Sequence, residues 1–81
     1  MIIHFYGSLG ERIGRRLEVA LPGGVRDVAD LRRLLIAQHP AAAEELSRQS
    51  VRAVVGDTIV DDSFPLAGAE QVDFLPPLSG G

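Results

Sequence analysis

Cysteine and lysine are both absent from this sequence of 81 residues. The absence of cysteine excludes disulfides, thiolate metal sites and a cysteine nucleophile, so any sulfur that the protein handles is not carried by a side-chain thiol. The absence of lysine excludes a Schiff base, a P-loop lysine and a side-chain amine for isopeptide attachment. The side chains therefore offer neither a thiol nor a primary amine for covalent chemistry.

Long apolar runs and an excess of positive charge are also missing. No segment approaches transmembrane length, and the opening MIIHFY has neither a basic start nor a small-residue cleavage site, so we expect a cytoplasmic protein without a membrane partner. The net charge of -3 and the pI near 5.2 disfavour nucleic acid as a partner. What remains is ordinary globular composition, sufficient for one domain with a modest core.

Five short segments have the β-branched, aromatic or alternating character of strands. Their ranges are 2–6, 16–21, 51–56, 58–60 and 71–75. Between the first two, GSLGERIG is punctuated by glycine, which predicts the loop of a hairpin.

Residues 27–39 predict the main helix. Asp27 can cap its first turn, and apolar side chains recur after it at helical spacing. The helix should end before Pro40, which cannot continue the hydrogen-bond ladder. The segment PAAAEELSRQ that follows predicts a second, short helical turn.

The order strand, strand, helix and then strands predicts an α+β fold of two layers. Because only the connection between the second and third strands holds a substantial helix, we expect a β-grasp (ubiquitin-like) fold. Its mixed sheet would have four to five strands, with the first and last as central neighbours and the main helix on one face. Residues 1–75 would form this domain, and residues 76–81 a flexible C-terminal tail.

Alternation along the first and last strands assigns their side chains to two faces. Phe5 and Phe74 should meet the helix. Tyr6 and Leu75 should form an apolar spot on the opposite face, beside the root of the tail. We interpret this spot as a docking surface, with isolated exposed side chains as the alternative.

The last six residues, PPLSGG, have the composition of a slender tail that presents the C-terminal residue for reaction. Pro76 and Pro77 stiffen its root, and Leu78 and Ser79 extend it. The six residues can span roughly 20 Å, so we expect these four residues to contact a partner as the tail reaches the bottom of its pocket. Gly80 and Gly81 have no β-carbon, so they can thread a tight groove and leave the last carbonyl carbon open to attack. An ionised α-carboxylate is a poor electrophile, so another protein would have to activate it. The alternative is a frayed end without function.

Four stretches resemble the small, sulfur-carrying subunit of molybdopterin synthase, in the MoaD/ThiS group of ubiquitin-like sulfur carriers. They are IHFYGSLGERIG, DVADL, PLAGAEQVDFLPP and the terminal PPLSGG. The last is the most specific, because two prolines, two further residues and a diglycine are typical of this subunit. Three positions depart from the usual pattern of these relatives: Gly10, Gly56 and Ala69.

This resemblance implies that an activating enzyme adenylates Gly81 with ATP and converts it to a thiocarboxylate. The tail would then enter the large catalytic subunit of molybdopterin synthase and give its sulfur to a pterin precursor, in molybdenum cofactor biosynthesis. The chain itself would be non-catalytic and would bind no cofactor. Two alternatives stay open: a sulfur carrier for thiamine, cysteine or tRNA thiolation, and a ubiquitin-like modifier whose tail is joined to a lysine of another protein.

Other polar residues predict no site of their own. His4 and His39 lie on different elements and favour surface or partly packed imidazoles over a metal site. Three acids after the third strand, Asp57, Asp61 and Asp62, lack the pattern of a calcium loop, so we expect a turn of solvated acids. Arg52 could point towards the tail's side of the sheet. The remaining arginines that we considered are expected on solvated faces: Arg12, Arg15, Arg16, Arg32 and Arg33. For the first three, contact with an acidic partner is the alternative.

Overall fold

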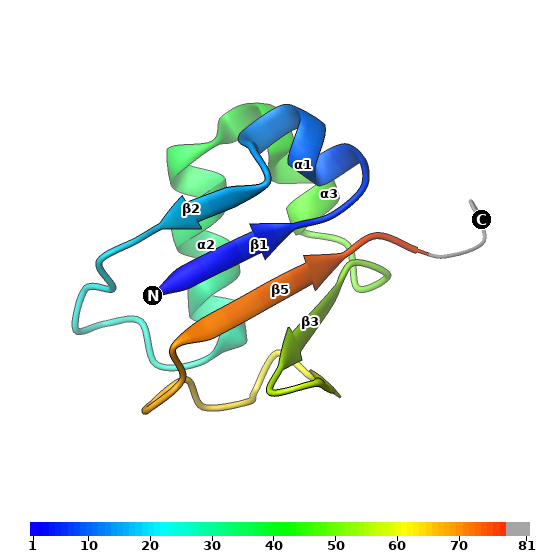
Figure 1. The fold of residues 1–81 in the computed structure, drawn as a ribbon. Coiled ribbons are helices and arrows are strands. Elements are labelled where there is room, and N and C mark those ends of the chain that lie inside the picture. Colours follow the sequence, from blue (N-terminus) through cyan, green and yellow to red (C-terminus); the bar gives the residue numbers. More distant parts are fainter. Residues whose placement is uncertain (78–81) are drawn as a thin grey trace.

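Five strands form one mixed sheet in the order β2-β1-β5-β3-β4 (Figure 1). The computed structural model describes residues 1–77. The central strands, β1 and β5, run parallel, and the other pairs are antiparallel. The strands are β1 (Ile2–Phe5), β2 (Arg16–Glu18), β3 (Arg52–Val55), β4 (Thr58–Val60) and β5 (Gln71–Leu75). The predicted β-grasp sheet, with its first and last strands as neighbours, is confirmed, although β2 is shorter than the alternation predicted.

The helices lie on one side of this sheet (Figure 1). They are α1 (Ser8–Ile13), α2 (Val28–Gln38), the 3-10 turn η1 (Pro40–Ala42) and α3 (Ala43–Leu46). The side chain of Asp27 caps α2 by accepting a hydrogen bond from the Asp30 amide at 2.9 Å, and α2 ends before Pro40. Both features confirm the predicted main helix. No helix within residues 1–77 has the length and apolar character to cross a membrane.

The core lies between α2 and the sheet. Phe5 and Phe74, on the two central strands, stack with ring centroids 5.8 Å apart and are almost fully buried. Leu31 and Leu35 of α2 are fully buried in the same cluster. Burial of a large apolar side chain stabilises the fold by roughly 1.5–3 kcal/mol. The predicted inward direction of both phenylalanines is therefore confirmed.

The predicted hairpin loop between β1 and β2 is wrong, because this segment forms α1. Its Leu9 is fully buried against the core, and this tertiary burial outweighs the low helix propensity of the neighbouring glycines. A β-carbon on Gly10 would lie 2.8 Å from the carbonyl oxygen of Phe5. Glycine at this position thus lets α1 close tightly onto the end of β1.

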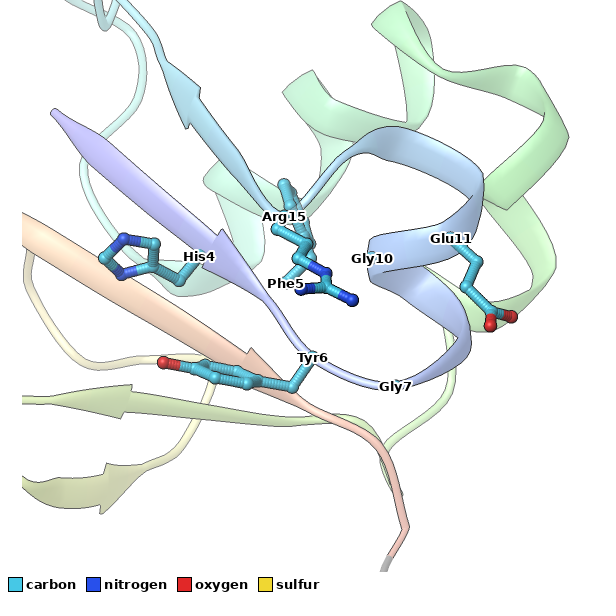
Figure 2. Close-up of a pocket in the computed structure, with 7 residues that line it drawn as sticks. All are labelled: His4, Phe5, Tyr6, Gly7, Gly10, Glu11 and Arg15. Atoms are coloured by element: carbon cyan, nitrogen blue, oxygen red, sulfur yellow. The ribbon is translucent and has the colours of Figure 1, made fainter.

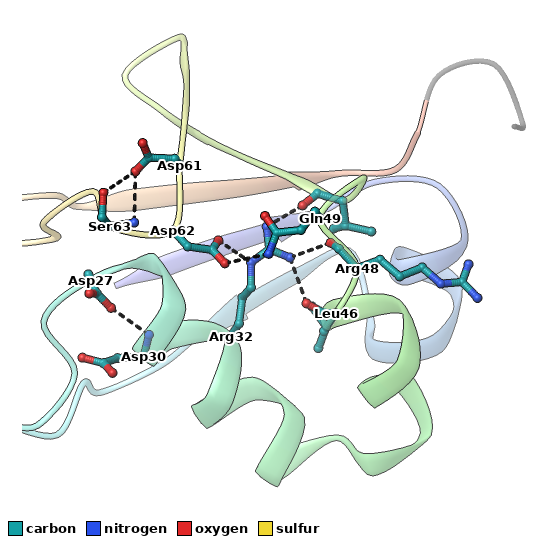
Figure 3. A network of polar contacts seen from close by, with 10 residues as sticks. Asp27, Asp30, Arg32, Leu46, Arg48, Gln49, Asp61, Asp62 and Ser63 are labelled. Atoms are coloured by element: carbon teal, nitrogen blue, oxygen red, sulfur yellow. Dashed lines mark hydrogen bonds and ion pairs between the residues drawn. The ribbon is translucent and has the colours of Figure 1, made fainter.

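The prediction that Arg32 is solvated is also wrong. Arg32 is only 7% exposed. Its guanidinium donates hydrogen bonds to the carbonyl oxygens of Leu46 (2.8 Å), Arg48 (3.2 Å) and Val51 (Figure 3). The guanidinium carbon also lies 5.4 Å from the centroid of the Phe74 ring. Arg32 therefore ties α2 to the segment that leads into β3.

An acid of the predicted solvated turn completes this contact. Asp62 accepts from Arg32 Nε at 2.9 Å and from Gln49 Nε2 at 3.2 Å. The expectation of a solvated turn therefore fails for Asp62. It holds for Asp61, which is exposed and pairs with Ser63. The other arginines expected on solvated faces are exposed as predicted: Arg12, Arg15, Arg16 and Arg33.

Candidate functional site

The ends of β1 and β5 meet where the chain leaves the sheet. Phe5 pairs with Phe74, and the Tyr6 amide then donates to the Phe74 carbonyl at 3.1 Å, which carries the pairing one residue beyond β1. Tyr6 and Leu75 consequently lie side by side on the face opposite the helices. Tyr6 is 48% exposed and Leu75 is half-buried. Their placement on this face is as predicted, whereas a docking role stays a prediction.

Pro76 is fixed in place by a close contact with Gly7. A β-carbon on Gly7 would lie 2.7 Å from Pro76 Cγ, and Gly7 has φ 65° and ψ -142°. Such a backbone conformation is nearly restricted to glycine. The start of α1 therefore holds the first residue of the tail. Pro77 is exposed, and Leu78, Ser79, Gly80 and Gly81 lie outside the described residues.

Arg52 and Ile59 extend this apolar surface across the neighbouring strands. Arg52 pairs directly with Leu75 in the β3–β5 register, so its side chain lies on the same face, which the sequence left open. Ile59 of β4 is 61% exposed. We call the set of six residues the tail-root patch: Tyr6, Arg52, Ile59, Leu75, Pro76 and Pro77.

Two hollows in the surface border Tyr6 and Leu75. One has a volume of about 620 Å³ and lies beside the end of β1; its lining side chains, Arg15 among them, are drawn in Figure 2. Its lining consists of His4, Phe5, Tyr6, Gly7, Gly10, Glu11 and Arg15. The other, of about 470 Å³, is lined by Ser50, Arg52, Ile59, Leu75, Pro76 and Pro77. The patch is therefore a contoured surface and not a flat one.

Sequence reasoning missed Ile59 as a member of the tail-root patch and Arg15 as part of the hollow beside Tyr6. A strand of three residues gives too short an alternation to assign a face to Ile59. Arg15 precedes β2, and its carbonyl accepts from the Phe5 amide at 3.0 Å, so its place depends on the register between β1 and β2, which the sequence does not give. The spacing of the glycines around α1 was the available sequence signal for this segment, but the same spacing is equally typical of a loop.

Polar side chains occupy the middle of the same sheet face. His4 Nδ1 lies 3.1 Å from Asp73 Oδ1, and Gln71 Nε2 lies 2.9 Å from both atoms. These residues contact one another and form a polar cluster next to the tail-root patch. No group of three or more potential metal ligands is present among residues 1–77.

Two carboxyl groups, those of Asp30 and Asp61, have lowered pKa values, and neither residue lines a hollow. A hydrogen bond from the Arg26 amide, together with one from Arg33, lowers the pKa of Asp30. The Ser63 hydroxyl and amide lower the pKa of Asp61. Neither group sits beside a candidate substrate, so we assign the two shifts to local structure and not to chemistry.

Comparison with known protein families decides the broader identity of the chain. Residues 3–81 match the ThiS family, a match that includes the tail. The chain belongs to the ThiS family. Members of this family are ubiquitin-like sulfur carriers, generally non-catalytic, and they work with partner enzymes. A comparison with curated proteins found no match.

A solved structure supports the fold of this ThiS-family chain. The crystal structure of SAMP1 from Haloferax volcanii aligns with a TM-score of 0.76 and 21% sequence identity. The alignment covers 99% of this chain and 97% of that one. At this identity the likeness shows the fold alone, and it confirms the ubiquitin-like β-grasp.

Proposed function

We propose that this ThiS-family chain is the sulfur-carrier subunit of molybdopterin synthase, and that Gly81 bears the sulfur as a thiocarboxylate. The observation that carries the proposal is the anchored tail root, where Gly7 and Pro76 hold the exit of a PPLSGG tail beside an exposed apolar patch. The family match, which runs to Gly81, supports it. Residues 1–75 act as the domain and residues 76–81 as the tail.

The chemistry requires two partners. An adenylating enzyme would use ATP: a carboxylate oxygen of Gly81 attacks the α-phosphate, pyrophosphate leaves, and a sulfur nucleophile then displaces AMP to give the thiocarboxylate. The large catalytic subunit would receive the tail and transfer its sulfur to a pterin precursor. As the acyl–sulfur bond breaks, water would supply the oxygen that regenerates the carboxylate. Both steps belong to the partners, in the cytoplasm, and this chain supplies no bound cofactor.

Each residue of the tail and its root has a role in this proposal. Gly81 is the acceptor, and Gly80 lets the end pass through a narrow channel. Leu78 and Ser79 span the distance from the domain, while Pro76 and Pro77 limit the conformations of the root. Ordering the four non-proline residues costs about 4–8 kcal/mol. Tyr6 and Leu75 would help to offset this cost by binding the partner's surface.

Membership of the ThiS family fits a second candidate, a sulfur carrier for thiamine, cysteine or tRNA thiolation. A ubiquitin-like modifier is the third. The chain has no lysine, so one copy cannot be attached to a side-chain amine of another, although attachment to other proteins stays open. All three require activation of the same carboxylate and differ in the acceptor.

Intact-mass spectrometry tests the proposal. The purified chain is incubated with the activating enzyme of its source organism, ATP and a sulfide donor, and we expect one oxygen to be replaced by sulfur at Gly81. Deletion of Gly81 should abolish this change while the melting temperature stays nearly the same, because a terminal residue contributes little to folding. An unchanged mass for the intact chain would refute the carrier function.

Adding the large synthase subunit and the pterin precursor then identifies the pathway. We expect the thiocarboxylate to return to a carboxylate as sulfur enters the pterin. Discharge only to a thiamine, cysteine or tRNA acceptor would favour the second candidate. A covalent ladder of conjugates on other proteins would favour the modifier.

A further inference from the structure

A single carboxylate joins α1 to α3 near the root of the tail. Glu45 Oε2 accepts a hydrogen bond from Ser8 Oγ at 2.7 Å, and Glu45 Oε1 forms an ion pair with Arg12 Nε. Ser8 and Arg12 are four residues apart, so they lie on the same face of α1. Figure 1 shows α1 and α3 side by side. Both oxygens of Glu45 therefore hold one face of one short helix.

The helix α1 depends on such contacts for its orientation. It has only six residues, and no side chain within residues 1–77 caps its start. A helix of this length is marginal in water by itself, so tertiary contacts set its direction. Burial of Leu9 holds α1 against the core, and the two contacts to Glu45 fix its rotation about that anchor.

The other end of this link, α3, is fixed to the core. Leu46 is fully buried, and its carbonyl oxygen accepts a hydrogen bond from the buried guanidinium of Arg32 at 2.8 Å. Glu45 directly precedes Leu46. Its side chain is only 19% exposed, whereas that of the neighbouring Glu44 is 85% exposed. Glu45 therefore reaches α1 from a rigid support.

The start of α1 is also where the tail root is held. Gly7 directly precedes Ser8, and its close approach to Pro76 leaves no room for a β-carbon. A hollow of about 320 Å³ lies between α1, α3 and the tail root, with Ser8, Glu45 and Pro76 in its lining. Because side chains do not fill this space, α3 acts on the tail root through α1 and not by direct packing.

We propose that Glu45 is a positioning residue for the tail. By fixing α1 it holds Gly7 against Pro76, so that the chain leaves the domain at Pro76 in one fixed direction. This inference rests on the proposed function, because a fixed direction has a use only if the tail must enter a partner. A residue that is ordered before binding loses less entropy on insertion. A loosened root should therefore weaken binding without changing the chemistry at Gly81.

Glu45→Ala tests this proposal against a matched control, Glu44→Ala. Glu44 belongs to the same helix and pairs with Arg48, and within residues 1–77 it forms no hydrogen bond or ion pair with α1. We expect the nuclear Overhauser contact between the Gly7 α-protons and the Pro76 γ-protons to be lost in Glu45→Ala and kept in Glu44→Ala. Glu45→Gln keeps one acceptor oxygen and should give an intermediate result. This measurement requires no partner.

Charging kinetics with the activating enzyme, ATP and a sulfide donor give the second measurement. Glu45→Ala should raise the KM for this chain about 5- to 10-fold, with kcat within about twofold, because only the order of the tail root changes. Ser8→Ala should raise the KM less, and it should add nothing in the Glu45→Ala background. Melting temperatures confirm that each variant is folded. A merely structural role would lower the melting temperature without changing the KM.

The outcomes separate the positioning role from the carrier function. If the wild type is charged but Glu45→Ala has the same KM as Glu44→Ala, the positioning role is wrong and the carrier function stands. Retention of the Gly7–Pro76 contact in both Glu45→Ala and Glu45→Gln would also overturn the positioning role. If Glu45→Ala loses the contact but the wild type is never charged, the carrier function is wrong, while the hold of Glu45 on the tail root stands.

Discussion

Gly7 links the end of the first strand to the root of the tail. Its positive φ and its contact with Pro76 leave no room for a side chain. We predict that Gly7→Ala lowers the free energy of unfolding by about 1–3 kcal/mol, because alanine is strained in this conformation and its β-carbon meets Pro76. The rate of charging should fall as well, since Pro76 must move. Urea denaturation and intact-mass kinetics measure the two effects.

Gly23→Ala provides the control for this substitution. A β-carbon at Gly23 meets nothing within 4 Å, and Gly23 does not have a positive φ. We expect the free energy of unfolding and the charging rate of this variant to equal those of the wild type. Equal stability of Gly7→Ala and Gly23→Ala would show that the contact with Pro76 does not constrain the tail.

At the scale of the element, α2 is held to the segment before β3 by one buried side chain. Arg32→Met keeps most of the apolar stem but removes the donors to the Leu46 and Val51 carbonyls and the partner of Asp62. We predict a loss of about 2–4 kcal/mol in the free energy of unfolding, because these buried acceptors would lose their partner. Urea denaturation at neutral pH measures it.

The adjacent residue supplies a matched control. Arg33 is exposed and pairs only with Asp30 on the surface of α2. Arg33→Met should therefore change the free energy of unfolding by less than about 1 kcal/mol. Similar losses for Arg32→Met and Arg33→Met would mean that the buried network contributes nothing specific.

Local signals in the sequence predict where α2 begins and ends, but they do not predict which of its arginines is buried. Asp27, the apolar spacing and Pro40 determine where α2 begins and ends, and these local signals were sufficient. They do not distinguish Arg32 from Arg33, because both residues flank the apolar stripe. Burial of Arg32 depends on carbonyls 14 to 19 residues further along the chain. The helix α1 escaped prediction for a similar reason, since only the distant core makes burial of Leu9 favourable.

At the scale of the whole molecule, the sheet could be predicted because alternation assigns faces without knowledge of contacts. Ile3, Phe5, Val72 and Phe74 are buried as their spacing requires. The outline of the tail-root patch could not be predicted, because it depends on register. Arg52 joins it through its pairing with Leu75, and Ile59 through its pairing with Val54.

Acid should destabilise the whole fold through two carboxyls. The pKa values of Asp30 and Asp61 lie below their ordinary value of 3.8, chiefly because of hydrogen bonds from Arg26 and Ser63 respectively. The unfolded chain therefore takes up these protons first. Their contribution to stability is present above pH 3.8 and is lost as the pH falls through the lower pKa values of the folded state.

Melting temperatures measured between pH 2 and 6 check this expectation. Ser63→Ala removes the hydroxyl that lowers the pKa of Asp61, so its melting temperature should fall less steeply in acid than that of the wild type. An identical acid profile for Ser63→Ala would show that this hydrogen bond does not contribute.

The parallel pairing of β1 with β5 also sets an order of events during synthesis. The strand that completes the middle of the sheet is made some 65 residues after its neighbour, so a nascent chain that still lacks β5 has no closed core. Tyr6 likewise has no Leu75 beside it until then. A surface that needs both side chains is therefore a property of the completed sheet and not of either strand alone.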